Sequence, residues 1–205
     1  KGVLDDLMEG FRLVKQNKVL LVLLLIGALM NFTFVPLNAF SVPFIADVLK
    51  GGAETLSIVQ ILFVAGMGLG SAVAPKIKHM SGRAQLVGFG LLSGAGLCLF
   101  ALGGYLPEKV LQFGTVFAAC LLIGIAAGVV GVVFGAAFLK LVPPDYMARM
   151  SGLSNAVLVC SMPIGNFLCS GLAAVMPVSV AILASGGLCF LLYLFILRVK
   201  SLQAL

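Results

Sequence analysis

The chain has 205 residues, of which 61% are hydrophobic and 10% are charged, and its formal net charge is +6. A soluble domain carries roughly a quarter charged residues and about half apolar ones, so this composition excludes an ordinary soluble globular protein. The apolar residues stand in blocks that approach or exceed the roughly 20 residues of a membrane crossing, which indicates an integral membrane protein. The basic residues flank these blocks, so the positive charge reports topology, and no nucleic-acid partner is expected.

Residues 1–17 differ from the rest of the chain. Their apolar residues fall on one helical face, and their charged residues lie largely elsewhere. The apolar residues are Leu4, Leu7, Met8, Phe11 and Val14. This pattern predicts a short amphipathic helix, either lying on the cytoplasmic membrane surface or serving as a soluble linker. Because the chain opens with Lys, we expect it to begin part-way through a longer protein.

Six apolar spans follow over residues 18–205, and each predicts one membrane helix. The spans are Val19–Ala46, Leu56–Ala74, Ala84–Tyr105, Val110–Leu141, Ser151–Met176 and Val178–Leu197. Gly and Pro residues mark the joints between them. The sequence therefore predicts an all-α membrane protein, a bundle of six transmembrane helices whose last two spans form an antiparallel hairpin.

Lys and Arg residues indicate the orientation of these spans. Of the 13 residues of these types, all except Lys50 and Lys109 lie before the first span, after the sixth, or in the joints that follow the second and fourth. Cytoplasmic loops of membrane proteins are enriched in Lys and Arg. We therefore expect both ends of the segment in the cytoplasm.

Uncharged polar residues lie inside the spans, whereas the acidic residues and the single His stand at span ends or in loops. No span therefore offers a central group that could exchange a proton. The candidate cavity-lining residues are Asn31, Phe34 and Asn38 in the first span, Gln60 in the second, and Asn155, Met162 and Asn166 in the fifth. An unpaired amide in hydrocarbon costs roughly 2–7 kcal/mol. These amides either bond to other helices or line a cavity for a bulky, largely hydrophobic ligand.

Prolines and glycines inside the spans are candidates for conformational roles. Pro36 and Pro163 bend their helices, and the kinks either shape a cavity and act as pivots or serve packing alone. The fourth span carries a glycine stripe along which another helix can pack closely or slide. The stripe consists of Gly124, Gly128, Gly131 and Gly135.

Catalytic motifs are missing from the sequence. It contains no Ser-His-Asp or Cys-His arrangement, no metal-ligand cluster and no Gly-Lys-Ser/Thr after its glycine-rich segments. We therefore expect neither an enzyme nor a metal protein.

Several segments resemble, in order and spacing, a known family. They are DDLMEGFRLVKQNKVL (5–20), Asn31-Phe32, Pro36-Leu37, LVPPDYMARMSGL (141–153) and Met162-Pro163-Ile164-Gly165. Together they resemble the C-terminal half of major facilitator superfamily efflux transporters, helices seven to twelve. The nearest branch is the macrolide-efflux type, with the enterobactin exporters as relatives. The resemblance covers essentially the whole chain.

Two cytoplasmic loops carry partial superfamily signatures. In PKIKHMSGR, Gly82 and Arg83 match a Gly-Arg pair, but the acidic residue expected upstream is absent. In PPDYMAR, Asp145 and Arg149 match acidic and Arg positions, with Ala148 where Gly is usual. The resemblance implies a gating role for these residues; capping of the next helix by Asp145 is the alternative.

The resemblance also implies a function. It points to a proton-coupled exporter of drugs or small hydrophobic molecules in a bacterial inner membrane, working by alternating access without a bound cofactor. The partner would be an N-terminal six-helix half of the same transporter, which would supply the proton-exchanging groups. The residues themselves leave two alternatives open: a stand-alone six-helix protein that transports as a homodimer, and a membrane scaffold that transports nothing.

Overall fold

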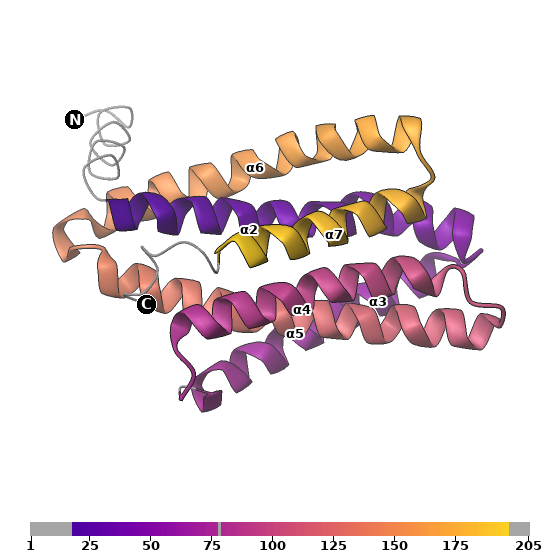
Figure 1. Ribbon diagram of the computed structural model, residues 1–205, viewed down its shortest axis with the longest axis horizontal. Coiled ribbons are helices and arrows are strands. Elements are labelled where there is room, and N and C mark those ends of the chain that lie inside the picture. The colour runs from indigo at the N-terminus through magenta and orange to yellow at the C-terminus, as the bar shows by residue number, and fades with distance from the viewer. Residues whose placement is uncertain (1–17, 78, 197–205) are drawn as a thin grey trace.

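A computed structural model describes residues 18–77 and 79–196 of the chain (Figure 1). Within these ranges, the side chains of residues 18–20, 22, 23, 26, 29, 30, 33 and 196 lie outside the description. The amphipathic helix predicted over residues 1–17 also falls outside it. The remainder contains six long α-helices and three short helical segments, and no strand in the described ranges. The predicted all-α membrane bundle is confirmed.

The helices coincide with the predicted spans to within a few residues. In chain order the elements are α2 (Lys18–Pro43), π-helical η1 (Phe44–Val48), α3 (Ala53–Val73), 3₁₀-helical η2 (Ala74–Ile77), α4 (Gly82–Gly103), α5 (Lys109–Leu141), 3₁₀-helical η3 (Pro144–Tyr146), α6 (Met147–Val175) and α7 (Val178–Ile196). Helical ends are where backbone groups lack partners, so differences of this size are expected there.

Local sequence explains several of these boundaries. The hydroxyl of Ser81 accepts a hydrogen bond from the Ala84 backbone N–H at 3.2 Å, which caps the start of α4. Lys50 has a positive φ of 55°, which interrupts the helical backbone conformation between η1 and α3. Pro36 and Pro43 lie inside α2, and the π-helical turn begins directly after Pro43. Proline removes a backbone donor, and such a loss favours an irregular turn.

The bundle consists of two three-helix sets, α2–α3–α4 and α5–α6–α7. The middle helix of each set packs against the first helix of the other set. The middle helix of the first set, α3, packs along α5, and the middle helix of the second set, α6, packs along α2. The third helices of the two sets, α4 and α7, pack on each other. Figure 1 shows α2 lying between α6 and α7, with α4 and α5 side by side below them. The second set therefore repeats the packing relations of the first.

The length and hydropathy of the helices fit membrane crossings. Five described helices are long and apolar enough to cross a bilayer, namely α3 with η2, α4, α5, η3 with α6, and α7. The first predicted crossing corresponds to α2, a helix of 26 residues. In this part of the chain, the longest stretch in which every side chain is described is Phe34–Val48, and it forms a shorter apolar helix. Six crossings therefore remain a prediction.

Burial is uneven among the helices. In the most apolar window of α5, 61% of residues are buried, against 17% in α3 and 11% in α6. The largest core cluster draws on all six long helices and on η1, and within it the rings of Phe44 and Phe100 lie 4.8 Å apart. The middle helices α3 and α6 are thus the two that the rest of the bundle covers least.

Candidate functional site

The uncovered sides of α3 and α6 carry large apolar side chains. On α3, Ile61 and Val64 are 65% and 64% exposed; on α6, Ile164 is 60% and Phe167 80% exposed. A surface of this kind requires either lipid or a packing partner. The candidate polar residues are distributed over these two helices and the adjoining α2.

The two amides of α2 bond to their own helix. The side-chain nitrogen of Asn31 donates to the Gly27 carbonyl oxygen at 3.3 Å, and that of Asn38 donates to the Phe34 carbonyl oxygen at 3.2 Å. Asn31 is half-buried and Asn38 is exposed. Each bond uses a single N–H, so the amide oxygen and second N–H are the groups that a ligand or water would meet. For these two residues, the described part of the structure contains no bond to another helix.

Three further amides face outwards. Gln60 on α3 and both Asn155 and Asn166 on α6 are exposed, and Met162 is 44% exposed. Asn155 and Asn166 are about three turns apart on nearly the same line of α6, with Met162 between them. Among the described residues these three amides have no hydrogen-bond partner. They are therefore available to a ligand or to a second bundle.

An aromatic contact connects α2 with α3 beside this face. The rings of Phe34 and Phe63 lie 6.2 Å apart, edge to face. Phe63 stands about one turn after Gln60 on α3. The structure thus joins Phe34 to the helix that carries Gln60. We call the exposed residues Asn38, Gln60, Asn155, Met162 and Asn166 the amide face; it is an open face of α2, α3 and α6.

The candidate gating residues occupy helix interiors and loops. Pro36 is buried in α2, and Pro163 is exposed in α6. Gly82 and Arg83 form the first turn of α4, and both are half-buried. Their predicted roles concern motion between two states, so they stay predictions.

The loop before α6 departs from one expectation. The N-cap position of α6 is Tyr146, and no side chain caps this helix. Asp145 lies in η3 and is exposed, so the alternative in which it caps α6 is wrong. Pro144 starts a 3₁₀ turn that places the N-cap position of α6 one residue beyond Asp145. The guanidinium of Arg149 lies 6.0 Å from the ring centre of Tyr146, a cation–π distance.

The glycine stripe of α5 divides into two parts. A Cβ atom on Gly124 or Gly128 would meet the backbone of α3, whereas one on Gly131 or Gly135 would have no neighbour within 4 Å. Only the first pair therefore lies in a helix contact. Its partners are Gly66 and Gly70 of α3. The matching four-residue spacing in the two helices is the sequence signal that identifies this pair.

Sequence analysis missed Gln85, a buried residue of α4. Its side-chain nitrogen donates to the Ile77 carbonyl oxygen at 2.9 Å and to the Met80 carbonyl oxygen at 3.1 Å. These two bonds hold the loop between α3 and α4, which contains the partial superfamily signature. A Gln at the start of a membrane helix, just before the apolar run that begins at Leu86, was the available signal.

Three known proteins are similar to the chain. Macrolide efflux protein A of Streptococcus pyogenes is 28% identical over 163 residues, which are 80% of this chain and 39% of that protein. Macrolide efflux protein A of Enterococcus faecalis is 28% identical over 160 residues, 78% of this chain and 48% of that protein. The uncharacterized MFS-type transporter YvqJ of Bacillus subtilis strain 168 is 26% identical over 182 residues, 89% of this chain and 41% of that protein.

The chain spans less than half the length of the curated relatives it matches. No family model matches the sequence, and no solved structure matches the chain. The relatives are transporters, not enzymes, and the long apolar helices fit part of such a transporter. The predicted resemblance to major facilitator efflux transporters is confirmed.

Proposed function

We propose that this chain, a homologue of major facilitator efflux transporters, is the C-terminal half of a proton-coupled exporter for small hydrophobic molecules. The observation that carries the proposal is the amide face. The two least covered helices, α3 and α6, carry exposed amides beside exposed large apolar side chains. A second six-helix half opposite this face would bury apolar residues on the same side, such as Val64 one turn after Gln60, and enclose the amides in a cavity between the halves.

The composition of the face indicates the class of substrate. It offers amide groups and a thioether at Met162, with the rings of Phe34 and Phe63 beside it, and no charge among its members. Such walls suit a bulky, largely apolar molecule with a few hydrogen-bonding groups. Amide hydrogen bonds are stronger in a medium of low dielectric constant than in water. A macrolide is the first substrate to test, because two relatives carry the name macrolide efflux protein.

The proton-exchanging group belongs, in this proposal, to the N-terminal half. The described acidic residues Asp47, Glu54, Glu108 and Asp145 stand in η1, at helix ends or in loops. A carboxylate in such a position does not lie on a proton path across the hydrocarbon. The membrane potential supplies roughly 2.3 kcal/mol per charge per 100 mV to a proton moving inwards, which can drive expulsion of a neutral molecule.

Alternating access requires helices that move relative to a stable base. Close backbone packing holds α3 against α5. By contrast, α6 carries Pro163 and packs chiefly on α2, which carries Pro36. We assign the bending between the outward-open and inward-open states to α2 and α6, because proline weakens the backbone hydrogen-bond ladder at those points.

Transport by the full-length protein in inverted membrane vesicles tests this function. Asn38→Leu and Asn166→Leu should each lower the rate of macrolide transport about tenfold, the effect of losing roughly 1.4 kcal/mol of hydrogen bonding. Ile164→Leu is the control, because Ile164 is also exposed on α6 but lies on the opposite side from Asn166. Normal transport by both Asn variants, at normal membrane levels, would show that the amide face is not the substrate site.

The length of the native gene product separates the alternatives. A chain with six further membrane helices before Lys1 supports the two-half transporter. A functional homodimer of the 205-residue chain in the vesicle assay would support the stand-alone transporter instead.

A further inference from the structure

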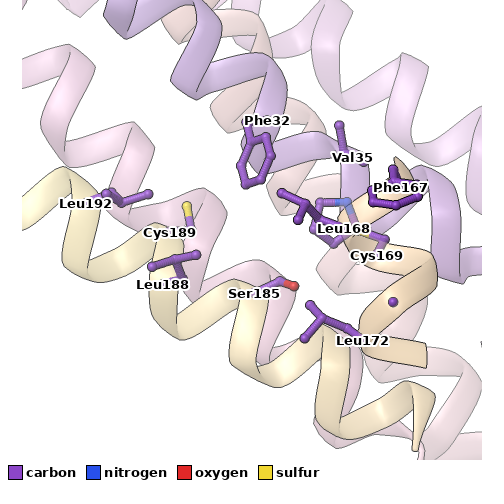
Figure 2. Close-up of a pocket in the computed structure, with 12 residues that line it drawn as sticks. Phe32, Val35, Phe167, Leu168, Cys169, Leu172, Ser185, Leu188, Cys189 and Leu192 are labelled. Atoms are coloured by element: carbon purple, nitrogen blue, oxygen red, sulfur yellow. The ribbon is translucent and has the colours of Figure 1, made fainter. Parts of the chain in front are cut away.

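A pocket of about 420 Å³ lies between α2, α6 and α7 (Figure 2). Phe32, Val35 and Pro36 of α2 form one wall. The segments 167–172 of α6 and 185–192 of α7 supply the other walls. All three contributing stretches are well inside their helices, so in a bilayer the pocket lies within the hydrocarbon layer.

Two polar side chains of the pocket wall are already bonded. The Ser185 hydroxyl donates to the Ala181 carbonyl oxygen at 2.8 Å, and the Cys189 thiol donates to the Gly90 carbonyl oxygen at 3.8 Å. No charged residue is among the described residues that line the pocket. A buried water needs two to four polar partners, which this wall does not offer. The pocket therefore favours a hydrocarbon occupant over water.

The pocket is separate from the amide face. On α2, the side that carries Phe32 and Pro36 is rotated about the helix axis by about a third of a turn from the side that carries Asn31 and Asn38. The contact between α2 and α6 lies between the two regions, since a Cβ on Gly165 would come within 2.8 Å of the Val35 side chain. A ligand in the pocket would consequently not occupy the proposed substrate site.

The mouth of the pocket is continuous with an apolar outer surface. At its rim, Phe167 is 80% exposed, and Leu168 and Leu188 are each 49% exposed. Figure 2 shows Phe167 and Leu168 on α6 across from Leu188 on α7. In a membrane, the medium that touches such a surface is lipid hydrocarbon.

In the other three-helix set, the contact that corresponds to the one between α2 and α7 is tightly packed over part of its length, and a pocket of about 360 Å³ lies farther along it, beside Gly82, Gln85 and Lys140. By the packing relations of the repeat, α5 corresponds to α2 and α4 corresponds to α7. There, a Cβ on Gly96 would lie 2.6 Å from Ile123, and one on Gly103 would lie 2.7 Å from Val116. Glycine packing thus fills the α4–α5 contact at Gly96 and Gly103.

We propose that this pocket binds one acyl chain of an anionic phospholipid. An empty pocket of this size would deprive its walls of dispersion contacts, and an acyl chain restores them without leaving a hydrocarbon environment. The charge pattern favours an anionic headgroup. The start of α2 and the end of α7 lie at the same end of the bundle (Figure 1). Lys18 is the first residue of α2, and Arg198 and Lys200 come shortly after α7 in the sequence. Basic residues beside membrane helices attract anionic lipids.

Photo-crosslinking of the full-length protein tests the site. The probe is phosphatidylglycerol with a diazirine near the end of one acyl chain, incorporated into proteoliposomes, and labelled peptides are identified by mass spectrometry. We expect labelling to concentrate in residues 167–172 and 185–192. Phosphatidylcholine with the same acyl chain should label these peptides about fivefold less, which corresponds to the roughly 1 kcal/mol that a basic residue contributes near an anionic lipid surface.

Two glycines of α6 provide matched variants. Gly171 lines the pocket and Gly152 does not, and a Cβ on either would meet nothing within 4 Å. Gly171→Phe should reduce labelling of the pocket peptides about fivefold, because the ring takes the space of the acyl chain, and Gly152→Phe should leave labelling unchanged. Ser185→Leu fills the same space from α7 and should act like Gly171→Phe.

Three outcomes would overturn the proposal. Labelling spread evenly over the apolar outer surface would mean that no site exists. Equal labelling by the two lipids would exclude the anionic headgroup. Displacement of the probe by an excess of transported macrolide would assign the pocket to the substrate. None of these outcomes depends on whether the amide face binds the substrate, so the two proposals fail independently.

Discussion

Replacement of Gly128 by Ala probes the contact that joins α3 to α5. The two helices meet backbone to backbone through Gly66 and Gly70 on α3 and Gly124 and Gly128 on α5. A Cβ on Gly66 would lie 2.5 Å from the Leu121 carbonyl oxygen, and one on Gly128 would lie 2.8 Å from the Ser71 nitrogen. Real methyl groups do not approach backbone atoms closer than 3.0 Å, so Gly128→Ala must push the helices apart.

The expected cost follows from three contributions. Overpacking of a tight contact costs about 1–3 kcal/mol. Separation of the helices weakens Cα–H···O contacts, worth about 0.5–1 kcal/mol each. Against this, Ala favours the helical state over Gly by about 0.8–1 kcal/mol. We expect Gly128→Ala to reduce the free energy of unfolding by about 1–3 kcal/mol.

Gly131→Ala is the matched control on the same helix. A Cβ at Gly131 would meet nothing within 4 Å, so this variant has no clash and keeps only the gain in helix propensity. Its free energy of unfolding should be unchanged or higher by up to about 1 kcal/mol. Reversible unfolding of the full-length protein in mixed micelles, with increasing SDS, measures both values.

One pattern of results would refute this reasoning. If Gly131→Ala destabilises the protein as much as Gly128→Ala does, the close contact at Gly128 is not what distinguishes the two positions. The whole stripe would then act as one packing surface, as the spacing of its glycines alone suggested.

Three other variants test separate contacts. Gln85→Leu removes the donor for two loop carbonyl groups and should cost about 1–3 kcal/mol, seen as faster trypsin cleavage in the loop between α3 and α4. Gly90→Ala intrudes on the buried ring of Tyr193 and should lower the unfolding midpoint by a similar free energy of about 1–3 kcal/mol; an unchanged midpoint would mean that the ring relaxes freely. Cysteines at His79 and Glu108 test orientation, because a membrane-impermeant maleimide added outside cells should label only the second, and labelling of the first would invert the topology.

The membrane helices were predictable because their signal is local. A run of apolar residues must match the thickness of the hydrocarbon layer, and each span can be recognised without knowledge of any other. The boundary of α5 shows this well: the predicted span 110–141 differs from the observed helix Lys109–Leu141 by a single residue. Signals at helix ends are weaker, and Asp145 is a case where a plausible cap lies one residue outside the cap position.

The candidate site was predictable only in part. The spacing of Asn155, Met162 and Asn166 places them along one side of a helix, and their exposure on α6 agrees with a face that needs a ligand or partner. The spacing does not reveal what an amide bonds to. Asn31 and Asn38 donate to carbonyl groups of their own helix, an outcome that depends on side-chain rotamers and on how closely neighbouring helices approach.

The sequence by itself determined that the chain is a bundle of apolar helices with uncharged polar residues inside them, because apolar length and residue type are properties of each segment alone. The tertiary structure decided which surfaces meet. It selected Gly124 and Gly128 from a uniform stripe, and it left an opening between α2, α6 and α7. Such choices depend on contacts between segments far apart in the chain, where shape complementarity, and not local pattern, determines the packing.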